Sequence, residues 1–188
     1  MMRSTLPVLI LAVAVTATHA TTFEPALGVT LPDEVAGLSF AGKKEFPQKE
    51  LGVNYAWQRN GPTRGSVFIY TAGAKAIPDG TEAPIVRRHF DQVIGEVQQM
   101  ATIGRARSVT LSGSSEQVTH YSGCGPQFIW RGYEIVLDEG SLTSYTYVTG
   151  LKNNFVKLRI SHLKGDAQAA KDTERFVQEI RKVLGGCK

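Results

Sequence analysis

The chain has 188 residues, a net charge of +4 and 42% hydrophobic residues, which is enough for one domain with a buried core. Its lysines and arginines are scattered, so the pattern does not indicate nucleic-acid binding. His89, His120 and His162 are too dispersed for a familiar metal-ligand spacing, and no glycine-rich phosphate or dinucleotide loop occurs. We therefore expect no metal, no cofactor and no nucleic-acid partner.

The first 20 residues have the three parts of a secretory signal peptide. Arg3 supplies the positive start, residues 6–15 form an uncharged apolar stretch, and small residues precede Thr21. The apolar stretch is shorter than the roughly 20 residues of a membrane-spanning helix. We expect cleavage before Thr21, a periplasmic or secreted protein with no membrane span after signal removal, and a single domain over residues 21–188. Removing Arg3 lowers the net charge from +4 to +3.

Two cysteines, Cys124 and Cys187, remain in the expected mature chain. An even number of cysteines in an exported protein predicts a disulfide. The alternative is a hydrolase in which the Cys124 thiolate is the nucleophile and His120 its base. In an extended strand, residues four apart lie about 13 Å from each other, which is beyond hydrogen-bond reach. The disulfide is therefore the favoured interpretation.

Ser161 and Lys164 form an S-x-x-K sequence, a second candidate for nucleophilic catalysis. In penicillin-binding enzymes this tetrad opens a helix, and two further motifs complete the site. Here it lies at the end of an expected strand, and neither further motif is present. Ser161 is the weaker of the two hydrolase candidates.

The first half of the chain predicts strands and one amphipathic helix. A segment at 31–40 carries apolar residues that could cover a core but is interrupted by proline and glycine. Apolar residues recur at three- and four-residue steps over about 83–102, with Pro84 in the first turn, which predicts a helix. The strands expected before this helix are 42–47, 52–59 and 66–71.

The second half predicts five strands and a closing helix over 166–184, with Asp166 as its N-cap. Glycine or asparagine stands at the turns, as tight antiparallel connections require. Together the elements predict an α+β fold, in which an antiparallel sheet of about six to eight strands packs with two amphipathic helices. The five strands are 105–112, 114–122, 127–137, 141–149 and 154–162.

This order of elements resembles the PsbP-like fold. The likeness spans about residues 30–184 and is carried by the strand pair "SLTSYTYVTG…NNFVKLRISH", which runs into an amphipathic C-terminal helix. "FVKLRIS" is similar to a strand phrase of small exported bacterial proteins. The resemblance implies an accessory or binding scaffold, and it implies no catalytic residue because the fold has no shared active site.

A polar and aromatic sheet face is the candidate binding site. Alternation along the strands places Lys157 with Arg159, and we expect pairing to bring further tyrosines and an arginine onto the same surface. Such a surface could bind an anionic or sugar-like ligand, or an acidic partner. The alternative is an ordinary solvated sheet face. The expected site residues are Arg131, Tyr133, Tyr145, Tyr147, Lys157 and Arg159.

The loop at 72–83, with Lys75 and Asp79, is a second candidate because long loops on rigid scaffolds often carry function. The sequence thus favours a non-catalytic binding or accessory protein for an unknown acidic ligand or an envelope protein. A structural envelope protein without a small-molecule ligand remains a further alternative.

Overall fold

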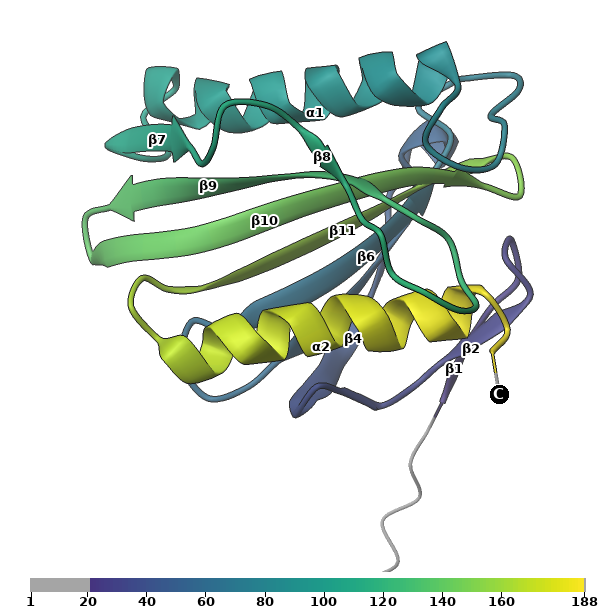
Figure 1. Ribbon diagram of the computed structural model, residues 1–188, viewed down its shortest axis with the longest axis horizontal. Coiled ribbons are helices and arrows are strands. Elements are labelled where there is room, and N and C mark those ends of the chain that lie inside the picture. Colours follow the sequence, from purple (N-terminus) through teal and green to yellow (C-terminus); the bar gives the residue numbers. More distant parts are fainter. Residues whose placement is uncertain (1–20, 188) are drawn as a thin grey trace, which may run out of the picture.

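A computed structural model describes residues 21–187, in which one large antiparallel sheet has a helix on each face (Figure 1). The expected signal peptide lies outside the described residues. The elements are β1 (Thr22–Glu24), β2 (Val29–Leu31), β3 (Glu34–Val35), β4 (Leu38–Glu45), the 3₁₀ helix η1 (Lys49–Leu51), β5 (Val53–Gln58), β6 (Arg64–Tyr70), α1 (Pro84–Thr102), β7 (Ser108–Leu111), β8 (Gln117–Val118), β9 (Ile129–Leu137), β10 (Gly140–Leu151), β11 (Asn154–Leu163) and α2 (Ala167–Leu184).

The α+β fold with its antiparallel sheet and two helices is confirmed. The strand order is β3-β4-β5-β6-β11-β10-β9-β7, and β8 also pairs with β9. The sheet has nine strands, one more than the upper limit expected from the sequence, and β1 and β2 form a separate two-stranded sheet. The additional strands are short pieces that lack a clear alternating pattern.

The predicted strand over 114–122 is wrong. Only β8 within it pairs with a neighbour, and the chain from 119 to 128 is a loop. Gly123 and Gly125 in this loop have positive φ angles of 80° and 107°. Both glycines follow the expected strand, and their conformations keep this part of the loop irregular.

Helix α2 covers one face of the sheet, and its position depends on a glycine beneath it. Phe176 and Trp57 are both buried here, with ring centroids 5.8 Å apart. A Cβ atom on Gly65 would lie 2.5 Å from the Phe176 ring, so the helix can approach β6 only because this position has no side chain. Asp166 caps the helix as predicted, since its carboxylate accepts a hydrogen bond from the Ala169 amide at 2.8 Å.

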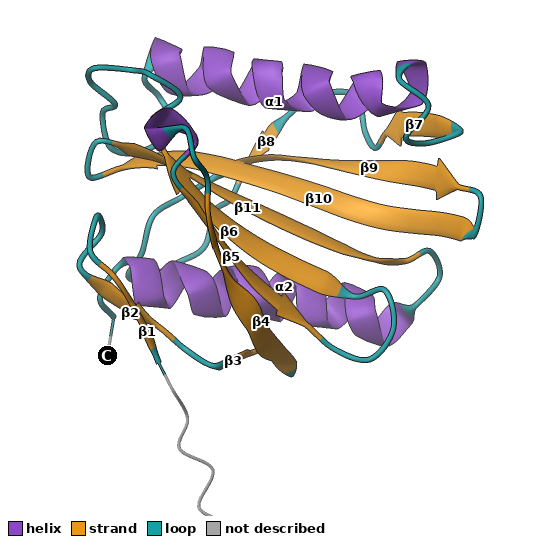
Figure 2. Ribbon diagram, turned by 180° about the vertical axis from the view of Figure 1, so that it is seen from behind, coloured by secondary structure: helices purple, strands orange, loops and turns teal. Residues whose placement is uncertain are grey.

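Helix α1 covers only part of the opposite face. Its buried side chains pack on β7, β9 and β10, where Phe90 meets Val148 and Ile129. Figure 2 shows no α-helix in front of β11, β6, β5 and β4, where the short 3₁₀ helix η1 lies over one end of the strands, while α2 lies behind the sheet. One half of this face is therefore open.

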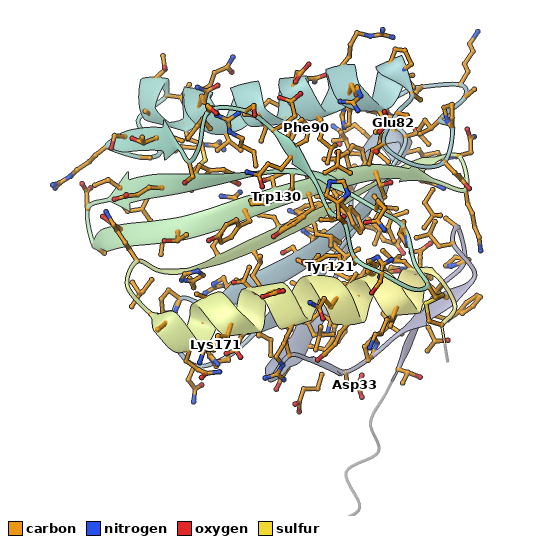
Figure 3. All side chains as sticks on the ribbon, viewed as in Figure 1. Asp33, Glu82, Phe90, Tyr121, Trp130 and Lys171 are labelled. Carbon is orange, nitrogen blue, oxygen red and sulfur yellow. A yellow bond between two sulfur atoms is a disulfide. The ribbon has the colours of Figure 1, made fainter. Side chains whose placement is uncertain are left out.

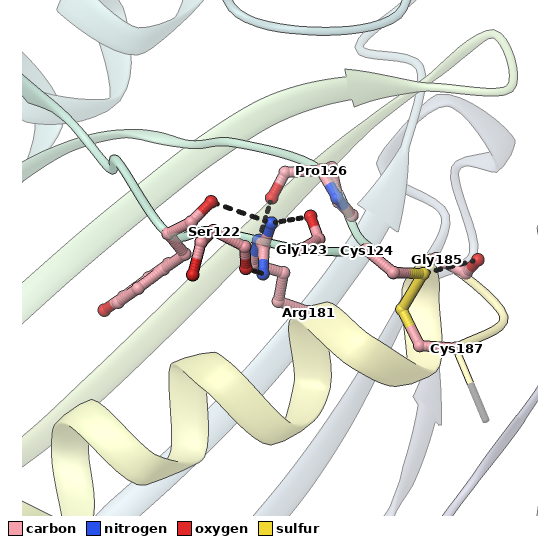
Figure 4. The surroundings of a disulfide bond; sticks show 8 residues. Ser122, Gly123, Cys124, Pro126, Arg181, Gly185 and Cys187 are labelled. Atoms are coloured by element: carbon pink, nitrogen blue, oxygen red, sulfur yellow. Dashed lines mark hydrogen bonds between the residues drawn. A yellow bond between two sulfur atoms is a disulfide. The ribbon is translucent and has the colours of Figure 1, made fainter.

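The C-terminal end of α2 is anchored to the 119–128 loop by the predicted disulfide. Cys124 and Cys187 are bonded, with their Cα atoms 5.8 Å apart. Beside this bond, and within residues 21–187, the buried Arg181 guanidinium donates its hydrogen bonds to backbone carbonyl groups (Figure 4). The acceptors are the carbonyl oxygens of Tyr121, Ser122, Gly123 and Pro126, at 2.9 to 3.4 Å.

We predict that Arg181→Met lowers the free energy of unfolding by about 3 kcal/mol, because the loop carbonyls lose their buried donor. Equilibrium urea unfolding with the disulfide intact measures this effect. The control is Lys182→Met on the same helix turn, where the side chain is exposed and little change is expected. Equal stability of the two variants would contradict this role of Arg181.

Candidate functional site

The expected site residues divide between the two faces of the sheet. In the observed register Thr146 pairs with both Arg131 and Arg159, which places these three residues on the open side, the side of α1. Tyr145 pairs with Ile160 and therefore lies on the opposite side. The expectation that all six residues share one surface is wrong, because the two tyrosines of β10 face α2.

The turn between β10 and β11 decides this arrangement. Lys152 and Asn153 are its two central residues, and both have positive φ angles, of 48° and 60°. Such two-residue turns fix the pairing of the strands that they join. A shift by one residue would move every side chain of β11 to the other face relative to β10.

Tyr145 and Tyr147 belong to the core on the α2 side. The Tyr147 ring stacks on Trp130 at 5.7 Å, and burial raises the pKa of Tyr147 above its ordinary value. The ring of Tyr145 lies 6.1 Å from that of Trp130. Figure 3 shows Trp130 on the sheet and Tyr121 on the loop that passes over this side. Tyr147 is buried here, while Tyr145, Trp130 and Tyr121 are half-buried against the core under α2.

Four of six neighbouring strands place cations on the side of α1. No residue on this side of β4, β5, β6, β11, β10 or β9 has a carboxylate. The acidic residues of these strands are Glu45 and Glu134, and both point to the α2 side. Among the described residues, no ion pair is formed by Arg159, Lys157 or Arg131. The cations on this side are Lys44, Arg64, Arg131, Lys157 and Arg159.

Arg131 and Tyr133 lie on the same side as Lys157 and Arg159. Arg131 is partly covered there, and Tyr133 is fully buried. The Arg131 guanidinium donates a hydrogen bond to the Gly113 carbonyl at 3.0 Å, and its buried Nε atom has no partner. Tyr133 is fully buried beside α1 and shares a hydrogen bond with the Thr146 hydroxyl. Arg159 and Lys157 are therefore the predicted site residues best placed to meet a ligand.

Lys157 stands at the border between the open face and α1. Its ammonium group lies 4.4 Å from the centre of the Phe68 ring and 5.5 Å from that of Tyr70. Burial lowers the pKa of Lys157 from its ordinary value, the nearby Glu96 carboxylate opposes this shift, and Arg159 adds to it. The side chain lines a cavity of about 200 Å³ between α1, β6 and the segment that includes η1.

His89 and Tyr70 form the floor of the same cavity. The Tyr70 hydroxyl and His89 Nε2 are 2.7 Å apart, and the imidazole stacks on Phe155 with ring centroids 4.0 Å apart. Burial, and next to it the charge of Lys157, lowers the pKa of His89, while Glu96 acts in the opposite direction. Burial raises the pKa of Tyr70. The pair is thus neutral at pH 7 and can offer hydrogen bonds without adding charge.

The loop at 72–83 is fastened to the β10–β11 turn. The Asp79 carboxylate accepts a hydrogen bond from the Lys152 amide at 2.7 Å, and the backbones of Gly80 and Gly150 form a bridge. Lys75 is exposed. Asp79 therefore has a structural contact, and the loop positions the turn that sets the register of the site.

Neither hydrolase candidate has a catalytic geometry. The sulfur of Cys124 is bonded to Cys187, which leaves no thiolate for the exposed His120 to activate. The Ser161 hydroxyl lies 2.6 Å from that of Ser144 on the α1 side. The Lys164 ammonium instead pairs with Glu134, which points to the other side of the sheet.

No protein-family model matches the chain, and no curated protein matches it. Within residues 21–187 there is no helix long and apolar enough to cross a membrane. The same residues contain no group of three or more His, Cys, Asp and Glu side chains placed to hold a metal ion.

Sequence reasoning missed the cavity residues His89, Phe68 and Glu96. His89 occupies the buried stripe of α1 and could have been found there as the one polar residue among aliphatic and aromatic neighbours. Phe68 and Glu96 meet Lys157 only through the pairing of β6 with β11 and the packing of α1. No local pattern indicates that contact.

We predict that the free energy of unfolding falls as the pH drops below 6.5, the ordinary pKa of histidine, because the unfolded chain then binds a proton that buried His89 resists. His89→Gln should reduce this pH dependence between about pH 7.5 and about pH 5.5. Urea unfolding at several pH values measures it. In the control His120→Gln, an exposed histidine is removed and the wild-type slope should persist. An unchanged slope in His89→Gln would count against this assignment.

Proposed function

We propose that this chain is an exported, non-catalytic binding or accessory protein that binds an anionic ligand on its open sheet face. The observation that carries the proposal is the set of five cations on one side of six strands whose own residues on that side include no carboxylate; the acidic group near Lys157 is Glu96 of α1. A positive field of this kind attracts anions and raises their local concentration.

Arg159 and Lys157 are the proposed ligand contacts. They stand two residues apart on β11, about 7 Å along one strand, which suits a ligand with two anionic groups. On the neighbouring strands Arg159 pairs with Ser66, which is half-buried and small, and with Thr146, which is buried, so a ligand would approach Arg159 from the side of β6. Hydrogen bonds to charged groups contribute about 1.5–3 kcal/mol each, which is sufficient for specific binding by a few contacts.

Export is the second part of the proposal. A structural disulfide between Cys124 and Cys187 fits an oxidising compartment. The resemblance to the PsbP-like fold also suits an accessory role, because that fold serves mainly as a binding scaffold. The expected cleavage before Thr21 would release the domain into the periplasm or the medium.

We predict that the exported protein begins at Thr21 and contains no free thiol. Intact mass and thiol titration in denaturant, on protein purified without reductant, measure both properties. The control is the same titration after reduction, which should reveal two thiols. A retained leader or two free thiols before reduction would contradict export with a closed disulfide.

The ligand-binding prediction uses citrate, a small polyanion, as the probe. Arg159→Gln and Lys157→Met should each weaken citrate binding about tenfold, because each removes one charge-assisted contact. Isothermal titration calorimetry at low ionic strength measures the affinity, and added salt should weaken it.

The matched controls remove the same residue types elsewhere. Arg105→Gln alters an exposed arginine after α1, and Lys171→Met alters an exposed lysine on α2 (Figure 3). Both should bind citrate as the wild type does. Absence of citrate binding, or binding that Arg159→Gln leaves unchanged, would contradict the proposed face and favour a structural envelope protein.

A further inference from the structure

The cavity beside Lys157 extends the cationic face into an apolar space. It holds about 200 Å³, whereas a dry cavity of about 150 Å³ accommodates one benzene molecule. There is thus room for an apolar group of about six to eight carbon atoms. Its walls are largely aromatic and aliphatic, and they include Phe46, Leu51, Phe68, Tyr70 and Val93.

The polar residues that line the cavity are Lys157, Glu96, Gln92, Tyr70 and His89, and their charges are unequal. Lys157 supplies the positive charge, while the buried pair of Tyr70 and His89 is hydrogen-bonded and neutral. Glu96 supplies a negative charge from α1, yet its carboxylate forms no ion pair with Lys157. The ammonium group is therefore partly desolvated over two aromatic rings without a direct counter-ion.

This arrangement favours an incoming anion over a neutral or cationic molecule. Burial has removed part of the water that stabilises the ammonium charge of Lys157. A carboxylate placed beside it would stabilise that charge instead, and the attraction would be strong because screening by water is weak there. An apolar arm on the same molecule would then displace water from the walls. A cation would meet both Lys157 and the neighbouring Arg159.

We propose that the ligand of this site is an amphipathic monocarboxylate, with its head group on Lys157 and an apolar arm of about six to eight carbons in the cavity. This inference rests on the anion-binding function proposed above and adds the class of ligand. Arg159, two residues along β11, lies on the same face and supports the head group from the open side.

Octanoate is the probe, and acetate and 1-octanol are its controls. Each methylene removed from water strengthens binding about fourfold, so octanoate should bind at least about tenfold more tightly than acetate. It should also bind at least about tenfold more tightly than 1-octanol, which lacks the charge. Calorimetry on the mature chain measures all three affinities.

Three variants test the assigned contacts. Lys157→Met should lower octanoate affinity about tenfold, because it removes the cation and keeps an apolar stem. Leu51→Ser, at an exposed position on the cavity wall, should lower octanoate affinity severalfold and leave citrate binding unchanged. Glu96→Gln should raise octanoate affinity about threefold, because it removes a negative charge near the head group.

The outcomes separate this inference from the function on which it rests. Citrate binding with octanoate no tighter than acetate would overturn the amphipathic ligand and retain the anion-binding face. Failure of both probes would overturn both proposals. Octanoate binding that is unaffected by Lys157→Met and Leu51→Ser, in variants whose circular dichroism matches the wild type, would also overturn the cavity assignment. Lys171→Met is the control and should bind octanoate normally.

Discussion

The architecture depends on the two-sided burial of β11. Its side chains at Val156, Leu158 and Ile160 pack under α2, while Phe155 on the other side packs under α1. Each fully buried aliphatic or aromatic side chain of this kind contributes about 1.5–3 kcal/mol, so the strand cannot shift its register without large losses. Both helices are consequently held at fixed positions on opposite faces.

The face of the nine-stranded sheet on the side of α2 is more fully covered than the face on the side of α1. The β1–β2 hairpin and the 119–128 loop complete the layer of α2, and the disulfide with Arg181 fastens that loop to the helix. On the side of α1 the short η1 segment lies over one end of β6, and no α-helix covers β6, β5 or β4 (Figure 2). Antiparallel sheets tolerate one solvated side, and the open half is where the cations gather.

Lys157 lies at the boundary between the part of the sheet that α1 covers and the part that is open. Phe155, two residues earlier on β11, is buried under α1 and is apolar. Lys171 on α2, by contrast, is an ordinary exposed surface lysine. At the boundary the stem of Lys157 is covered, its ammonium group rests on the Phe68 ring, and burial lowers its pKa. A lysine in such a place gains from a bound anion, which links the packing of the fold to the proposed function.

The amino-acid pattern alone determined the α+β class, both helices, the Asp166 cap and the pairing of Cys124 with Cys187, because these follow from local periodicity, capping chemistry and cysteine parity. It also identified Lys157 and Arg159 as neighbours on one strand face. Only the tertiary structure decided that Tyr145 and Tyr147 face the core. That outcome depends on the register set by the β10–β11 turn, and a change of one residue there reverses the faces. The cavity likewise required the packing of α1 against strands that are distant in sequence, which no local pattern encodes.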